Sequence, residues 1–142
     1  MTIAAILGGK GRIVHSIACS APVRDAIAML ADHRIGALPV MKGETVIGIM
    51  SERDVIYCLK SDGAAILDWP VERVMTTPAV TAAMDFGVMA ALSLMTRRRM
   101  RHLPVVENGR LTGIVSIGDL VKYRIDKIEQ EAEAMRAYIQ SA

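Results

Sequence analysis

Two kinds of apolar spacing alternate along the first half of the chain. Short runs that favour strands occupy residues 13–17, 35–41 and 45–50. Between the first two runs, apolar residues recur at the three- and four-residue steps of an amphipathic helix, at Val23, Ile27, Leu30 and Ala31. After the third run, Ser51 begins another helix, which Asp62-Gly63 ends. This pattern predicts the order strand, helix, strand, strand, helix.

The second half repeats this order of elements. Its predicted strands are residues 79–82, 101–106 and 111–115. Asn108-Gly109 joins the last two strands and is a strong signal for a hairpin. A helix between the first two strands is predicted from the spacing of Val88, Ala91, Leu92 and Met95. Ahead of the two halves, residues 3–7 and 71–75 share an apolar pattern. Residues 2–7 are expected to form a short helix or turn, and residues 8–12 a loop.

The similarity between the halves extends to individual residues. Residues 23–56 align with residues 88–121 without a gap, at a constant offset of 65 positions and with 10 identities in 34. Leu-Pro-Val at 38–40 recurs at 103–105, and Gly-Ile-x-Ser-x-x-Asp at 48–54 recurs at 113–119. An internal duplication of this length predicts two copies of one structural unit that pack against each other.

Composition limits the classes of protein to which the chain can belong. It is 52% hydrophobic but only 4% aromatic, so its core must consist of aliphatic residues and methionine. The net charge of +2 predicts neither nucleic-acid nor membrane binding, and no apolar run reaches the ~18 residues of a membrane span. Cys19 and Cys58 lack a Cys-x-x-Cys spacing and are expected to be reduced, buried thiols. We therefore expect a soluble, cytoplasmic protein.

The last predicted helix begins at Ser116 and continues beyond the point where its counterpart ends. Apolar residues step by four and three along it, at Val121, Ile125, Ile128, Ala132, Met135 and Ile139. Such a stripe, flanked by charged residues, is typical of a helix that packs against another helix. Packing onto the chain's own core and a seam between two chains fit the stripe equally well, and three heptads do not decide between them.

The duplicated unit, with Leu-Pro-Val on its second strand and Gly-Ile-x-Ser-x-x-Asp after it, resembles a CBS domain. Two such units in tandem resemble a Bateman module, and the chain is most similar to stand-alone CBS-pair proteins. The resemblance implies an α/β (α+β) fold of two β-α-β-β-α units related by a pseudo-two-fold axis, with an extended C-terminal helix. The implied domains are residues 1–63, residues 64–125 with a linker at 64–70, and a helical tail at 126–142.

The two Ser-x-x-Asp pairs have two interpretations. At a helix start such a pair forms a cap, but the free N–H groups there also attract an anion. A carboxylate at that position can also accept hydrogen bonds from the two hydroxyl groups of a ribose. The resemblance implies this second use, in which Asp119 and Asp54 would bind a ribose. Ser116 and Ser51 would then lie near a phosphate.

Basic residues that face the phosphate are also implied by the resemblance. Arg101 and His102 directly precede the buried Leu-Pro-Val strand of the second copy, where the first copy has Gly36 and Ala37. We therefore predict that the two clefts are unequal and that the one with Asp119 holds an anion better. Two further arginines at the preceding helix end are interpreted as solvated charges, Arg97 and Arg98.

An adenine ring would need an apolar slot, which in the family comes from the segment that leads into the opposite repeat. The predicted stronger site consists of Lys10, Ile13, His15, Arg101, His102, Ser116 and Asp119. The predicted weaker site consists of Ala37, Ser51, Asp54, Pro78 and Val80. A solvated loop explains Lys10 equally well, and His15 is expected to contribute only its backbone.

Three classes of function compete. Catalysis is disfavoured, because no nucleophile with a nearby base and no metal-ligand spacing is evident. We expect a non-catalytic regulatory module that binds an adenine nucleotide such as AMP, ADP, ATP or NAD and modulates an unidentified partner protein. The alternative is a dimerisation scaffold with degenerate clefts that bind no ligand. The resemblance implies a homodimer in either case.

Overall fold

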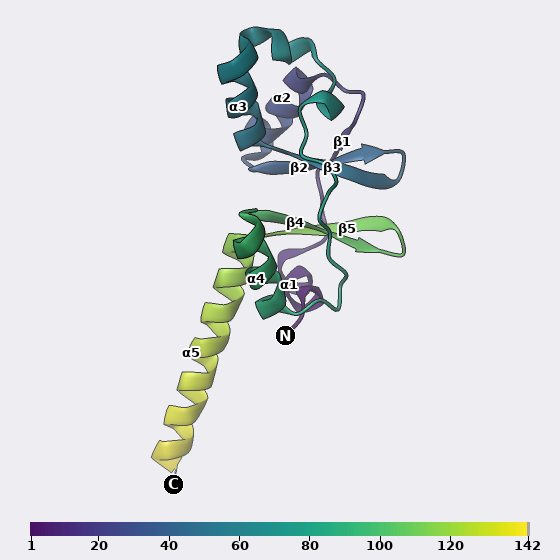
Figure 1. Cartoon of the computed structure of the whole chain (residues 1–142). Helices are drawn as coiled ribbons and strands as arrows, with labels where there is room; N and C mark the ends of the chain where they lie inside the picture. Colours follow the sequence, from purple (N-terminus) through teal and green to yellow (C-terminus); the bar gives the residue numbers. More distant parts are fainter. Residues whose placement is uncertain (142) are drawn as a thin grey trace.

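A computed structural model describes residues 1–141, and Ala142, the last residue of the predicted tail, lies outside the described residues. The helices are α1 (Ile3–Lys10), α2 (Val23–His33), α3 (Glu52–Asp62), α4 (Val88–Arg98) and α5 (Ile117–Ser141). The strands are β1 (Ile17–Ala18), β2 (Ala37–Lys42), β3 (Thr45–Ser51), β4 (His102–Glu107) and β5 (Arg110–Ser116). Two 3-10 helices, η1 (Gly63–Asp68) and η2 (Val71–Arg73), lie between the repeats. Figure 1 shows two α+β units stacked one on the other, with α5 projecting from the second.

Each repeat has an antiparallel hairpin at its centre, in equivalent registers. Leu38 pairs with Met50 in β2 and β3, and Leu103 pairs with Val115 in β4 and β5. The predicted turn at Asn108-Gly109 is confirmed, because both residues have the positive φ angles of a type I′ hairpin, 52° and 76°.

The first strand of each repeat is shorter than predicted. β1 contains only Ile17 and Ala18, which run parallel to β2. In the second repeat, the predicted strand at 79–82 is wrong except for a single bridge from Ala82 to Val105. The physical reason is that the preceding residues pair elsewhere. Thr76 exchanges two backbone hydrogen bonds of 2.9 Å with Ile49 of β3, which holds this segment against the first repeat.

The two hydrophobic cores cross the predicted domain boundaries. α1 belongs to the second core, where Ile3, Ile6 and Leu7 pack with residues of α4, β4, β5 and α5. The connection from η1 onward belongs to the first core, to which it contributes Ile66, Val71 and Val74. Figure 1 shows α1 beside α4 in the second unit. A boundary at residues 63 and 64 therefore separates the repeats in sequence, but not the bodies that pack.

Two glycines make this crossed packing possible. A Cβ atom at Gly48 of β3 would lie 2.6 Å from the Met75 sulfur and 2.8 Å from the Thr76 carbonyl oxygen. At the equivalent Gly113 of β5, it would lie 2.7 Å from a methyl carbon of Leu7. We call the chain before each repeat its lead-in segment; it contains Leu7 for the first repeat and Met75 and Thr76 for the second. Each lead-in segment thus lies directly on the hairpin of the other repeat. The same arrangement continues α1 through residues 8–10, so the predicted loop there is wrong and Lys10 is helical.

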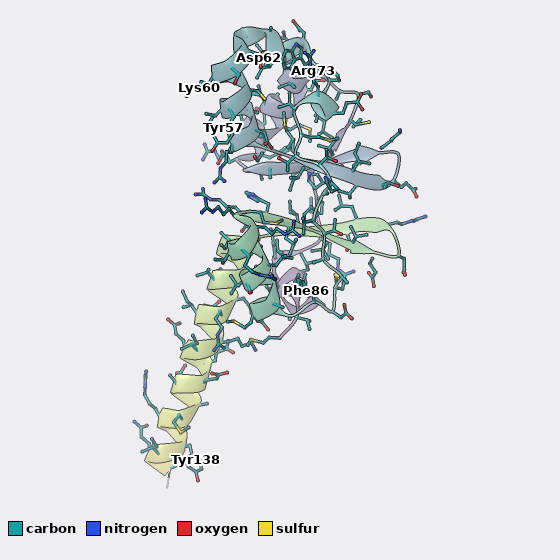
Figure 2. All side chains as sticks on the ribbon, viewed as in Figure 1. Tyr57, Lys60, Asp62, Arg73, Phe86 and Tyr138 are labelled. Atoms are coloured by element: carbon teal, nitrogen blue, oxygen red, sulfur yellow. The ribbon has the colours of Figure 1, made fainter. Side chains whose placement is uncertain are left out.

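The long final helix is confirmed, but its apolar stripe does not pack on the chain's own core. Leu120 is buried and Tyr123 packs on the second core, whereas Ile128 is 48% exposed and Ile139 66% exposed. In Figure 2, Tyr138 lies near the far end of α5, well away from both cores. Within residues 1–141, no helix combines the length and apolar character needed to cross a bilayer.

Candidate functional site

Both Ser-x-x-Asp pairs form reciprocal caps at helix starts. The Asp54 amide donates to Ser51 Oγ at 3.2 Å, and the Ser51 amide donates to Asp54 Oδ2 at 2.8 Å. The second repeat has the same two bonds between Ser116 and Asp119, at 3.1 and 2.8 Å. The capping interpretation is therefore confirmed in both copies, and the two carboxylates stand at the N-terminal ends of α3 and α5.

A cavity of about 400 Å³ opens beside Asp54. All five residues predicted for this cleft line it, namely Ala37, Ser51, Asp54, Pro78 and Val80. One wall is the lead-in of the second repeat, and Thr76 of this segment donates its hydroxyl to Asp54 Oδ1 at 3.0 Å. The volume lies within the range of small-molecule sites, so a nucleotide-sized ligand fits its scale.

The basic residues lie in a different cleft from the one predicted. Arg101 and His102 line the cavity beside Asp54, whereas the sequence predicted them beside Asp119. The physical reason is the pseudo-two-fold packing, which places the junction of α4 and β4 opposite the start of α3. The lead-in segments already follow this rule of contribution from the opposite repeat. If the same rule had been applied to the junction of α4 and β4, it would have assigned Arg101 to the cleft beside Asp54.

Sequence reasoning also missed several residues of this cavity. Arg98 was interpreted as a solvated helix end, but it lines the cleft, whereas Arg97 is absent from the lining. The other missed polar residues of the lining are Glu52, Arg53, Thr76, Thr77 and Arg99. Arg99 is the counterpart of Arg34 and shares its left-handed backbone, with φ angles of 53° and 51°. The alignment of Arg99 with Arg34 in the duplication was the sequence signal that could have identified Arg99.

His102 lies between the two repeats. Its imidazole occupies the space beside Gly36, where a Cβ atom would be 3.0 Å from the ring. Burial lowers the pKa of His102 below its ordinary value, and the positive charges of Lys10 and Arg101 act in the same direction. The carboxylates of Glu52 and Asp119 oppose this shift. His102 therefore favours its neutral form, and it feels charges from both clefts.

In the cleft beside Asp119, a lysine occupies the carboxylate. Lys10, at the end of α1, donates to Asp119 Oδ2 at 2.6 Å and to the Ile114 carbonyl at 2.8 Å. Burial alone raises the pKa of Asp119, but hydrogen bonds from Lys10 and Ser116 and the lysine charge outweigh it and lower the pKa. The predicted proximity of Lys10, Ser116 and Asp119 is therefore confirmed.

The remaining residues predicted for the Asp119 cleft do not form an open adenine slot. Ile13 is 86% exposed, so it provides no enclosed apolar surface. His15 stacks on His33, with ring centroids 3.7 Å apart. In the duplication these histidines are the counterparts of Val80 and Arg98, both of which line the open cavity. The two histidines thus stack on each other at positions whose counterparts line the open cavity.

A family model of the CBS domain matches residues 12–61 and 71–126. The chain belongs to the CBS domain family. The two matches cover both repeats, and the fold is that of a tandem CBS pair. A CBS-domain-containing protein from Agrobacterium tumefaciens has a structure with a TM-score of 0.83 and 38% identity, over 87% of this chain and 99% of that one.

Two further CBS proteins are similar to the chain. The mitochondrial CBS domain-containing protein CBSX3 of Arabidopsis thaliana is 35% identical over 83% of this chain, which spans only 60% of that protein. A CBS domain protein from Pyrobaculum aerophilum, solved in complex with AMP, is 27% identical. Its TM-score is 0.73, over 84% of this chain and 89% of that one.

Proposed function

We propose that this CBS pair is a non-catalytic regulatory module that binds an adenine nucleotide in the Asp54 cleft. The observation that carries the proposal is a cavity that combines a carboxylate at a helix start, an apolar lead-in and a basic wall. The AMP complex of the related Pyrobaculum protein supports an adenine nucleotide as the ligand.

The geometry of the cleft suggests how each part of a nucleotide is held. Asp54 Oδ1 accepts from the Thr76 hydroxyl in the free protein, and a ribose hydroxyl would replace that neutral donor. Pro78 and Val80 would cover one face of the adenine ring. The phosphate would point toward Arg101 and the junction of α4 and β4, where guanidinium groups offer charge-assisted hydrogen bonds.

The proposal assigns one nucleotide to each chain. In the Asp119 cleft, a ribose would have to displace the ammonium group of Lys10, a charged donor 2.6 Å from the carboxylate. A bond between two opposite charges is stronger than the bond from the neutral Thr76 hydroxyl to the Asp54 carboxylate. The expectation from the sequence that Asp119 forms the better site is therefore replaced by the opposite proposal.

Regulation would follow from the position of the ligand between the repeats. A nucleotide in the Asp54 cleft touches α3 of the first repeat and the lead-in and α4–β4 junction of the second. It therefore favours the relative arrangement of repeats in which these segments are closest. A partner protein that contacts both repeats would respond to this change.

Calorimetric titration with AMP, ATP and NAD tests the function. Wild type should bind at least one of them with a stoichiometry near one, and Asp54→Ala should abolish that binding. Asp119→Ala is the matched variant, because it removes the equivalent carboxylate from the other cleft, where Lys10 occupies it, and it should retain binding. Loss of binding in Asp119→Ala alone would contradict the assignment of the site. If wild type binds none of the three below millimolar concentration, the dimerisation scaffold replaces the nucleotide sensor.

We also propose that the chain forms a homodimer through α3 and α5. Large apolar side chains stand exposed on both helices, namely Ile56, Tyr57, Leu59, Val121, Ile125, Ile128, Met135, Tyr138 and Ile139. Figure 2 shows Tyr57 and Lys60 on the outer side of α3. A second copy of the same helices would cover these residues with a surface of the same chemistry.

A further inference from the structure

We propose that the Asp54 cleft selects adenine ligands that carry two or more phosphate groups, an inference that rests on the proposed function. The proposal rests on a cluster of four arginines around one cavity, Arg53, Arg98, Arg99 and Arg101. Arg53 stands in the first turn of α3, and the other three stand at the end of α4 and just before β4. The arginines therefore approach the cavity from both repeats.

The local backbone explains why three arginines share one wall. α4 ends at Arg98, and Arg99 has a left-handed conformation with a φ angle of 53°. This conformation reverses the chain, which enters β4 at His102. Residues on both sides of the reversal thus line the same cavity.

The charges of this cluster are not neutralised within the described part of the chain. In residues 1–141, the ion pairs are Lys10–Asp119, Arg24–Asp68 and Arg110–Glu44. None of the four cleft arginines takes part in one. The cavity also contains the carboxylates of Glu52 and Asp54, so the guanidinium groups exceed the carboxylates by two. This excess is present without any charge on His102, and it attracts anions.

The number of donors distinguishes one phosphate from several. Four guanidinium groups carry ~20 N–H donors, whereas a terminal phosphate offers only about three acceptor oxygens. A monophosphate therefore leaves most of the cluster unused, and a chain of phosphates gives further arginines an acceptor. An adenosyl ligand with a positively charged sulfonium group, such as S-adenosylmethionine, meets like charge in the same place.

The Asp119 cleft lacks this cluster. The counterparts of Arg98 and Arg101 in the first repeat are His33 and Gly36, so only Arg34 remains equivalent to Arg99. The two clefts therefore differ in their number of arginines as well as in the donor that holds their carboxylate. Selection by phosphate number is therefore expected of the Asp54 cleft alone.

The test is calorimetric titration with adenosine, AMP, ADP, ATP and S-adenosylmethionine in magnesium-free buffer that contains a chelator. ATP should bind at least about tenfold more tightly than AMP, because each added charge-assisted bond is worth roughly that factor. ADP should lie between them, and adenosine and S-adenosylmethionine should bind most weakly. The ATP advantage should shrink as salt rises.

Two variants connect this preference to the arginines. Arg98→Ala and Arg101→Ala should each reduce the ratio of ATP to AMP affinity, and the double variant should bring it close to one. Both side chains are exposed, so thermal melting should show folded protein. Arg97→Ala is the control, because Arg97 lies in the last turn of the same helix but outside the cavity, and its loss should leave the ratio unchanged.

The outcomes separate this inference from the proposed function. Equal affinities for adenosine, AMP and ATP would overturn the phosphate selection and leave the nucleotide site in place. An ATP preference that survives the double variant would overturn the role of the arginines. An absence of binding by every adenine ligand would overturn both the inference and the proposed function.

Discussion

Asp54 and Asp119 occupy equivalent residues of the duplication, but different donors hold their carboxylates. Asp54 accepts from a neutral hydroxyl, that of Thr76, at 3.0 Å. Asp119 accepts from the ammonium group of Lys10 at 2.6 Å. Within residues 1–141, no lysine lines the cavity beside Asp54, so this cation has no counterpart in the first cleft. The side chain of Lys10 therefore accounts for the difference between the accessible carboxylate of Asp54 and the occupied carboxylate of Asp119.

Lys10→Met should raise the pKa of Asp119 and lower stability at neutral pH. The pair is partly exposed, so we expect a loss of only about 0.2–1 kcal/mol. A carboxylate with a lowered pKa stabilises the fold above its unfolded pKa, and this contribution disappears as the pH falls through its folded pKa. The difference between wild type and variant should therefore be largest above about pH 4 and vanish in stronger acid. Urea unfolding across this range measures it.

The control for this substitution is Lys42→Met, which removes the same charge from an exposed position at the end of β2. It should change stability little, with no dependence on the titration of Asp119. A pH-independent difference between wild type and Lys10→Met would show that the ion pair contributes nothing.

At the scale of elements, the lead-in segments determine the walls of the clefts. α1 packs on β5 at Gly113, and the chain around Met75 packs on β3 at Gly48. The backbone bonds between Thr76 and Ile49 continue this contact into the wall of the Asp54 cavity. The shape of the cavity therefore depends on how closely one lead-in approaches one strand.

Gly48→Ala should destabilise the fold by about 1–3 kcal/mol, the usual cost of overpacking. The added methyl group would lie 2.8 Å from the Thr76 carbonyl oxygen, so the lead-in must move. That movement should also weaken nucleotide binding, which calorimetry would detect.

Gly8→Ala is the matched control for Gly48→Ala. Gly8 lies in α1, and a Cβ atom there meets nothing within 4 Å. It should be neutral or slightly stabilising, because alanine favours a helix. If Gly48→Ala is as stable as this control, the close approach does not determine the packing.

The whole molecule has one side with no internal partner. The outer faces of α3 and α5 carry most of the exposed large apolar residues, and α5 extends well beyond the second core (Figure 1). Isolated helices of this kind are stabilised mainly by packing of an apolar face. A second chain is the occupant that we propose for it.

Ile128→Glu should weaken the proposed dimer at least about tenfold, because it places a charge in the apolar seam. Sedimentation over a range of micromolar concentrations measures the change. Gln130→Glu is the control, because it introduces the same side chain two residues away, on the opposite face of α5. A monomeric wild type at these concentrations would remove the dimer from the proposal, and equal weakening by both variants would remove the stripe from the contact.

The sequence alone determined the features of this protein that depend on local interactions. The Asn108-Gly109 turn follows from the backbone freedom of two neighbouring residues, and the caps at Ser51 and Ser116 from side chains three positions apart. The duplication determined that two equivalent units exist. These signals are contained within a few residues, or in a repeated order of residues, so they can be read without coordinates.

Only the tertiary structure decided which parts of the two units meet. A duplication identifies equivalent positions, but it does not say which repeat a position faces. The pseudo-two-fold packing placed Arg101 beside Asp54, α1 in the second core and the apolar stripe of α5 outside both. It also brought Lys10 to Asp119, 109 positions away in sequence. Contacts over such separations depend on how whole elements pack, and no local pattern records them.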